Sequence, residues 1–228
     1  MHIEPGVVMG AKLMVGYATA AGVLLYAAKQ SLNVIRKDGM AALGVRTLLS
    51  ALLVFCFFEV LPHYPVGVSE VHFILGSTLF LIFGAAPAAL GLAAGLLIQG
   101  VFLAPFDLPQ YGMNVTSLLA PLFIIHVLAR RIIPENTAYK DVQYKQALML
   151  STAYQGGVVT WVAIWASMGG GFGAENLAAI ASFGAAYMLV IIVEPVVDLA
   201  VLAAAKSLHR LSDSMVFHSR LNRAVTAS

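Results

Sequence analysis

The amino-acid sequence predicts an all-α integral membrane protein, a bundle of seven transmembrane helices with its N-terminus outside and its C-terminus in the cytoplasm. Of its 228 residues, 60% are hydrophobic and 11% are charged, and the mean hydropathy is +0.88. Soluble domains carry about 25% charged residues. Two further observations support this class: the apolar segments have the length of membrane spans, and Lys and Arg are unevenly distributed between the loops.

The composition also excludes classes of protein. A soluble enzyme, a nucleic-acid-binding protein and a secreted disulfide module all need more polar surface than this chain carries. The single cysteine, Cys56, lies in an apolar run and has no partner for an intramolecular disulfide. No basic region precedes an apolar core at the start of the chain, so we expect no signal peptide and a mature protein that begins at Met1.

Five apolar segments have the length of single membrane spans, which need roughly 20 residues. They cover residues 7–30, 43–61, 113–128, 146–168 and 177–205. Between the second and third lies a stretch of 34 residues, 71–104, without a formal charge. This stretch is long for one helix and short for two full spans. Gly84 and Pro87 lie near its middle, where a helix would break.

The placement of basic residues favours two helices in this stretch. Cytoplasmic loops of membrane proteins carry an excess of Lys and Arg. With seven spans, twelve of the 13 basic residues fall on the cytoplasmic side, and only Lys12 does not. The twelve are Lys29, Arg36, Lys37, Arg46, Arg130, Arg131, Lys140, Lys145, Lys206, Arg210, Arg220 and Arg223. One span would place the middle and last groups outside.

The chain is expected to form one transmembrane substrate-binding domain, residues 1–205, followed by a basic cytoplasmic tail, residues 206–228, near lipid headgroups. Small residues such as Gly16, Gly91 and Gly95 recur along the helices. Small residues let helix backbones approach closely in lipid. We expect them to serve packing within the bundle, and a docking surface for a partner subunit is the alternative.

A histidine at position two gives the chain a candidate metal chelate. The Met1 amine, the His2 backbone nitrogen and the His2 imidazole lie close together in sequence, and Cu(II) and Ni(II) favour such tetragonal nitrogen sites. His72 is the natural fourth donor, because it opens the third span at the same outer face. His63, in the preceding loop, is a weaker candidate. Alternatively, His2 is a hydrated polar group at the interface.

Several segments resemble the CbiM/NikM family, the substrate-specific membrane components of cobalt and nickel energy-coupling factor transporters. The resemblance extends over residues 1 to 205. It rests on Met1-His2-Ile3, the Gly67–His72 loop, the spacing from His72 to Gly84, the helix break Gly84-Ala85-Ala86-Pro87, Gly112-Met113-Asn114, and Glu194 near the end.

The resemblance implies a function and its partners. Ni²⁺ or Co²⁺ would be held by Met1, His2 and His72 as transported substrate, with no organic cofactor. Asn114 would hydrogen-bond the site histidine, although it could instead cap the fifth helix. The chain has no phosphate-binding Gly-rich loop with Lys, so energy would come from separate cytoplasmic ATPase subunits through a transmembrane coupling subunit. A small accessory membrane subunit is a further candidate partner, and the location would be the bacterial cytoplasmic membrane.

The sequence also departs from the family pattern. Tyr187 stands where members often have a histidine, and Asp198 stands where they have threonine. Glu70 lies two residues before His72, where family loops often carry serine. These departures are compatible with a divergent branch.

Glu194 and Asp198 lie one helical turn apart within the last predicted span. Charges inside the membrane face the bundle interior and often mark a function. These two carboxylates form either a relay or coupling contact to the energising subunits, or a polar clamp between helices. His126, in the fifth span, is expected to be a packing residue.

Two other functions stay open at this point. The chain could be an accessory or structural subunit of a larger membrane complex that keeps the fold without transporting metal. It could also be an intramembrane metallohydrolase, which needs about three protein ligands and an open position for water. No His-Glu-x-x-His pair supports the latter. The same nitrogen donors suit nickel and cobalt, and copper would bind more tightly than either.

Overall fold

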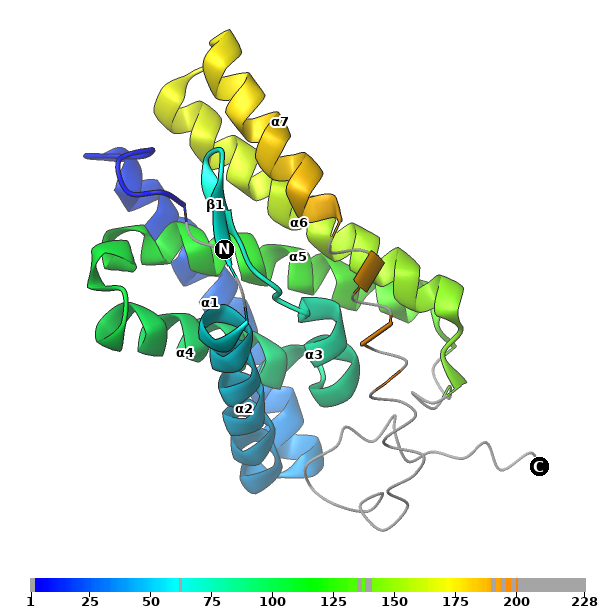
Figure 1. Cartoon of the computed structure of the whole chain (residues 1–228). Coiled ribbons are helices and arrows are strands. Elements are labelled where there is room, and N and C mark those ends of the chain that lie inside the picture. The colour runs from blue at the N-terminus through cyan, green and yellow to red at the C-terminus, as the bar shows by residue number, and fades with distance from the viewer. Residues whose placement is uncertain are drawn as a thin grey trace, which may run out of the picture.

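The computed structural model describes residues 3–61, 63–134, 137, 141–189, 192–193, 196–197 and 200. Met1, His2, Glu194, Asp198 and the predicted tail 206–228 lie outside these residues. The described part is a helical bundle with one small β-hairpin beside its helices (Figure 1).

The elements follow one another along the chain as the apolar segments predict. They are α1 (Lys12–Asp38), α2 (Met40–Phe55), the π-helical turn η1 (Cys56–Val60), β1 (Tyr64–Val66), β2 (Ser69–Val71), α3 (Gly76–Phe83), α4 (Ala85–Phe102), the 3-10 turn η2 (Pro105–Gln110), α5 (Tyr111–Ile132), α6 (Tyr144–Gly170) and α7 (Ala174–Met188). Within the described residues there are seven α-helices, the number predicted. The hairpin was not predicted, because residues 63–67 were expected to form a loop.

Four segments are long and apolar enough to cross a membrane: Met40–Val60, Ala85–Phe102, Pro105–Ile132 and Tyr144–Gly170. Residues 71–104 were expected to form two short helices, and α3 is the shorter of the two. Its 8 residues extend only about 12 Å, against a bilayer core of about 30 Å. Residues 72–75 lead directly into α3 and are not helical. All eight residues of α3 are buried, so protein rather than lipid surrounds this short helix.

The predicted helix break lies at Gly84. This residue ends α3 and precedes α4 with φ 90° and ψ 168°, a conformation that only glycine adopts readily. Pro87 lies in the first turn of α4, where the missing N–H costs no helical hydrogen bond. The two-helix interpretation of residues 71–104 is therefore confirmed.

The first helix is shifted relative to its prediction of residues 7–30. It begins at Lys12 and runs to Asp38. Gly6 and Gly10 take positive φ values of 94° and 65°, which interrupt helical geometry in the apolar segment before Lys12. Gly39, with φ 89°, ends the helix. Residues 3–10 are therefore available to form the N-terminal segment of the site.

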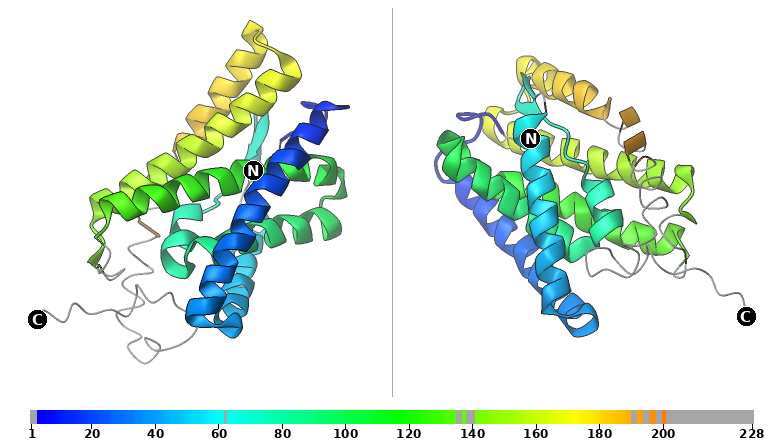
Figure 2. Two further views of the ribbon diagram at one scale, coloured as in Figure 1. Left: turned by 180° about the vertical axis from the view of Figure 1, so that it is seen from behind. Right: turned by 60° about the horizontal axis from the view of Figure 1, so that its bottom comes forward.

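Close helix contacts hold the bundle together. α5 packs against α1, α4 and α6, and α6 and α7 form an antiparallel pair beside it (Figure 2). A Cβ on Gly112 would lie 2.8 Å from backbone atoms of Gly16 and Tyr17, so α1 and α5 meet backbone to backbone. On α4, Gly91 and Gly95 leave room for the side chains of Ser50 and Val54 of α2. These glycines thus serve packing within the bundle, as the sequence predicted.

The connections gather at two ends of the bundle. At the hairpin end, the Tyr17 hydroxyl donates to the Leu108 carbonyl oxygen at 3.1 Å. At the opposite end, Arg46 pairs with Asp38 at 2.6 Å. A cavity of about 130 Å³ at this opposite end is lined by residues of α1, the α3–α4 break and His126.

Candidate metal-binding site

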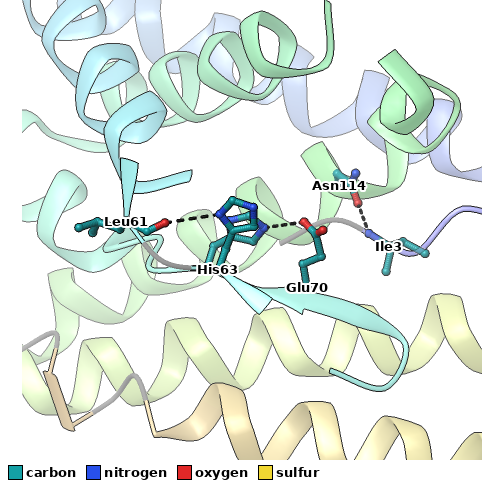
Figure 3. Close-up of polar contacts among 6 residues, drawn as sticks. Ile3, Leu61, His63, Glu70 and Asn114 are labelled. Atoms are coloured by element: carbon teal, nitrogen blue, oxygen red, sulfur yellow. Dashed lines mark hydrogen bonds and ion pairs between the residues drawn. The ribbon is translucent and has the colours of Figure 1, made fainter. Parts of the chain in front are cut away.

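The N-terminal segment is tied into the bundle immediately after its first two residues. Ile3 is fully buried, and its backbone N–H donates to Asn114 Oδ1 at 3.0 Å (Figure 3). Ile3 also forms an antiparallel bridge with Ser69, and the Glu4 N–H donates to the Val68 carbonyl oxygen at 3.3 Å. Ile3 and Glu4 are therefore held beside the hairpin, at its β2 side.

Two contacts anchor the next residues. The Val7 carbonyl oxygen lies so close to Gly169 that a Cβ there would be 1.8 Å away. The Lys12 ammonium donates to the Met168 carbonyl oxygen at 2.6 Å. Glycine at position 169 thus lets the N-terminal segment pass over the end of α6. The segment from Ile3 to Lys12 is therefore held by β2 and α5 at one end and by the end of α6 at the other.

The hairpin owes its place to a glycine turn. Strands β1 and β2 pair in the register Tyr64 with Val71 and Val66 with Ser69, leaving a two-residue loop. Gly67 opens that loop with φ 63°, as two-residue hairpin loops often require. A Cβ on Gly67 would lie 2.0 Å from the Ala179 carbonyl oxygen, so the loop sits directly on α7. Strand β2 therefore lies between β1 and the N-terminal segment.

His72 lies just after β2 and is buried, with 1% of its surface exposed. Its Nε2 lies 2.8 Å from Glu70 Oε2. Residues two apart on an extended chain point to the same face, which explains why these side chains meet. The Glu70 side chain is 26% exposed and lies between the buried imidazole and the surface.

Aromatic rings cover the faces of the His72 imidazole. The His63 ring stacks on it with centroids 4.8 Å apart and planes 12° apart, and the Phe58 ring lies 5.2 Å away. His63 is exposed, and its Nδ1 is 3.4 Å from the Leu61 carbonyl oxygen (Figure 3). In a stacked pair the faces of the two rings are in contact, whereas the lone pair of an imidazole nitrogen lies in the plane of its ring. His63 thus packs on His72, a contact that the sequence analysis missed.

Two acidic side chains, Glu4 and Glu70, lie close to this site. Burial raises the pKa of the Glu4 carboxyl above its ordinary value, and the nearby Glu70 carboxylate raises it further. The carboxylates of Glu4 and Glu70 therefore act on each other across the gap between the N-terminal segment and β2. Negative charge here favours the approach of a cation.

In the part of the chain that the structure describes, no three His, Cys, Asp or Glu side chains converge to hold a metal ion. His72 and Glu70 form a pair rather than a complete cage. A metallohydrolase, the alternative left open above, would draw its ligands from His2, His63, His72 and Glu70, and the described members of this set do not converge as three metal ligands. Any metal held at His72 would need donors beyond Glu70.

The remaining predicted residues lie elsewhere. Asn114 is the fourth residue of α5, whose N-cap is Gln110, so it does not cap that helix, and its side chain accepts a hydrogen bond from the Ile3 backbone. Tyr187 is fully buried and packs against the Phe183 ring at 5.1 Å. His126 meets the Phe80 ring edge-on at 5.8 Å, in agreement with a packing role. Met1, His2, Glu194 and Asp198 lie outside the described residues.

Comparisons with known proteins agree with this architecture. The family model described as CbiM, cobalt uptake substrate-specific transmembrane region, matches residues 2–210. A crystal structure of a truncated transition metal transporter is similar with a TM-score of 0.72 at 19% identity, covering 91% of this chain and 99% of that chain. A second transition metal transporter structure gives 0.70 at 19% identity, covering 94% and 95%. No curated protein matches the chain.

Proposed function

The chain belongs to the CbiM family of cobalt uptake substrate-specific transmembrane regions, and from this we propose that it captures a divalent transition metal, Ni²⁺ or Co²⁺, for an energy-coupling factor transporter. It is a multi-pass membrane protein of a transporter family. In our proposal the metal is held by the Met1 amine, the backbone and imidazole nitrogens of His2, and the His72 imidazole.

One observation carries this proposal: the antiparallel bridge between Ile3 and Ser69. Ile3 directly follows His2, and Ser69 lies three residues before His72. Continuing the same register by one residue would set His2 opposite Glu70, which contacts the His72 ring. The chain start then needs no long rearrangement to bring its nitrogens to the buried imidazole.

The donor set determines which ions are candidates. Four nitrogens in one plane suit Ni²⁺, and Cu²⁺ would bind still more tightly by the usual order of divalent affinities. Co²⁺ accepts the same donors, and the family description names cobalt. We therefore propose Ni²⁺ and Co²⁺ as the ions to test first, with Cu²⁺ as competitor.

The orientation proposed is hairpin end outside, in the bacterial cytoplasmic membrane. Arg36 and Lys37 lie in the last turn of α1, and Arg130 and Arg131 lie in the last turn of α5. Both turns belong to the opposite end of the bundle. The excess of Lys and Arg in cytoplasmic loops then directs the candidate site to the outer face.

The energy for uptake is proposed to come from other chains: a transmembrane coupling subunit, cytoplasmic ATPase subunits and, as a further candidate, a small accessory membrane subunit. This sequence contains no Gly-x-x-x-x-Gly-Lys phosphate loop. Glu194 and Asp198 remain candidates for a coupling contact or relay, and residues 206–228 for a basic cytoplasmic tail.

The decisive experiment compares metal retained after purification by the full chain and by a variant extended by one residue before Met1. The extension should abolish retention, because it moves the free amine out of the chelate. The same residue added after Ser228 is the matched control and should leave retention unchanged. His2→Ala and His72→Ala should each weaken binding. Equal retention by all of these proteins would refute the proposal.

A second candidate is an accessory subunit that keeps the fold without transport. The observation in its favour is Tyr187, which packs with Phe183 where the family often has a histidine. Co-purification with a respiratory or photosynthetic complex, instead of with an ATPase, would select this function.

A further inference from the structure

A groove opens on the outer surface of the bundle between α1 and α5. The two helices meet at Gly16 and Gly112 and then diverge toward their C-terminal ends (Figure 2). The α1–α5 groove has a volume of about 570 Å³. Ile124 and Val127 in its wall are 58% and 47% exposed, so the groove opens outward and not into the core. Its lining residues are Gly22, Val23, Tyr26, Ala120, Phe123, Ile124, Val127, Leu128 and Arg131.

The length of the groove matches one leaflet of a membrane. From Ala120 to Arg131, α5 rises about 16 Å, close to half of a bilayer core of about 30 Å. Arg131 lies in the last turn of α5, at the end of the bundle that we propose to be cytoplasmic. A lipid of the cytoplasmic leaflet with its headgroup beside Arg131 would therefore lay an acyl chain along the groove.

The body of the groove is apolar and has room for such a chain. No atom lies within 4 Å of the position that a Cβ on Gly22 would take. One turn further along α1, the Tyr26 ring meets the Phe123 ring edge-on, with centroids 4.6 Å apart. These two rings join the helices beside the open space at Gly22.

The end of the groove at the last turn of α5 is basic. Arg131 lines it and is exposed, and the exposed Lys29 lies three residues after Tyr26, on the same face of α1. The described residues that line the groove include no Asp or Glu. A guanidinium binds phosphate strongly, and basic pockets between transmembrane helices on the cytoplasmic side bind anionic headgroups.

We propose that the α1–α5 groove binds an anionic phospholipid of the cytoplasmic leaflet, with its phosphate at Arg131 and Lys29 and an acyl chain against Gly22. This site lies away from His72 and does not depend on metal capture, so it goes beyond the proposed function. A second groove of about 420 Å³, between α2 and α4, has no basic residue in its lining and should show no preference among headgroups.

A transmembrane helix of a partner subunit is the alternative occupant. Helices that pack closely in lipid meet at small residues. Only Gly22 and Ala120 are small in the lining of the α1–α5 groove, and bulky side chains form the rest of the wall. A flexible acyl chain fits such a wall better than a helix does, and the basic end matches a phosphate.

Native mass spectrometry of the full-length protein in detergent micelles tests the headgroup contact. Phosphatidylglycerol, which is anionic, should bind more tightly than zwitterionic phosphatidylcholine. Arg131→Gln should weaken phosphatidylglycerol binding about 5-fold, the effect of one basic residue beside a headgroup. Lys145→Gln, which removes a basic residue near the start of α6, is the matched control and should leave binding unchanged. Equal affinity for the two lipids, or equal effects of the two substitutions, would overturn the proposal.

Gly22→Leu tests the apolar part of the site, because the new side chain enters open space. It should weaken binding of phosphatidylglycerol several-fold, whereas Gly44→Leu, which fills the α2–α4 groove, should not. Glycerol phosphate, which has no acyl chain, should fail to displace the lipid, and displacement would overturn the role of the groove. Unchanged lipid affinity in Gly22→Leu, together with loss of a co-purifying coupling subunit, would assign the groove to a partner helix and refute the lipid site.

Discussion

Replacing Asn114 with alanine tests whether docking of the N-terminal segment controls metal binding. The substitution removes the acceptor of the Ile3 N–H, a bond of 3.0 Å between residues 111 positions apart in the chain. Ile3 is shielded from both water and lipid, since 0% of its surface is accessible. A buried donor left without a partner costs about 1–3 kcal/mol.

The cost destabilises only the docked state of the N-terminal segment. In the released state, water accepts the hydrogen bond from the Ile3 N–H. In the proposed chelate, metal would bind only when the chain start is docked, so the apparent dissociation constant should rise as the docked fraction falls. Where docking is marginal, as is common for chain ends, the full cost corresponds to about a 5- to 150-fold loss of affinity. Competition against a chromophoric chelator measures this loss, and hydrogen exchange of the N-terminal amides measures the release.

Ser31→Ala is the matched control. Ser31 is also buried, and its hydroxyl bonds only its own helix, at the Ala27 carbonyl oxygen, 2.8 Å away. It should leave metal affinity and N-terminal exchange unchanged. Equal affinity and equal exchange protection in Asn114→Ala and the unsubstituted protein would show that this bond does not govern the site.

Three further outcomes are expected. Gly169→Ala should displace the N-terminal segment and weaken metal binding several-fold, because the new Cβ would lie 1.8 Å from the Val7 carbonyl oxygen; chelator competition would detect no change if the contact is unimportant. Gly67→Ala should lower the melting temperature by the equivalent of about 1–3 kcal/mol, because the new Cβ would collide with the Ala179 carbonyl oxygen at 2.0 Å and the φ of 63° is unfavourable for alanine. Gly156→Ala is the control for both, since no atom lies within 4 Å of its Cβ position, and it should leave binding intact and stability equal or higher. Saturating Ni²⁺ or Co²⁺ at about 100 times its dissociation constant should stabilise the chain by about 2.7 kcal/mol, so chelation should lower the melting temperature, and a melting curve insensitive to metal would contradict specific binding.

The helix break at Gly84 shows what sequence reasoning can achieve here. The length of the uncharged stretch and the basic loops around it required two helices, and glycine offered the point of interruption. The structure places the break at that residue, with φ 90°. The requirement is local, because only glycine adopts this conformation without strain.

The start of the first helix shows where such reasoning fails. Val8 is apolar and lies within the first predicted span, residues 7–30. It is buried, but in a non-helical segment that precedes α1 and contains Gly10 with a positive φ. Apolar composition indicates which residues are buried, but it does not determine the backbone conformation in which they are buried.

The composition and the spacing of charges determined by themselves that this is a membrane protein with seven helices. A charge exposed to lipid is costly, so charged residues are rare within the membrane segments and gather in the loops. The histidine at position two and the resemblance to the CbiM/NikM family identified His72 and the chain start as the candidate metal donors. Only the tertiary structure decided that Ile3 lies against Asn114 and Ser69, that Glu70 engages the Nε2 of His72, and that His63 covers the ring. Such contacts join residues far apart in the chain or on different faces of one hairpin, and their geometry depends on how the whole bundle packs.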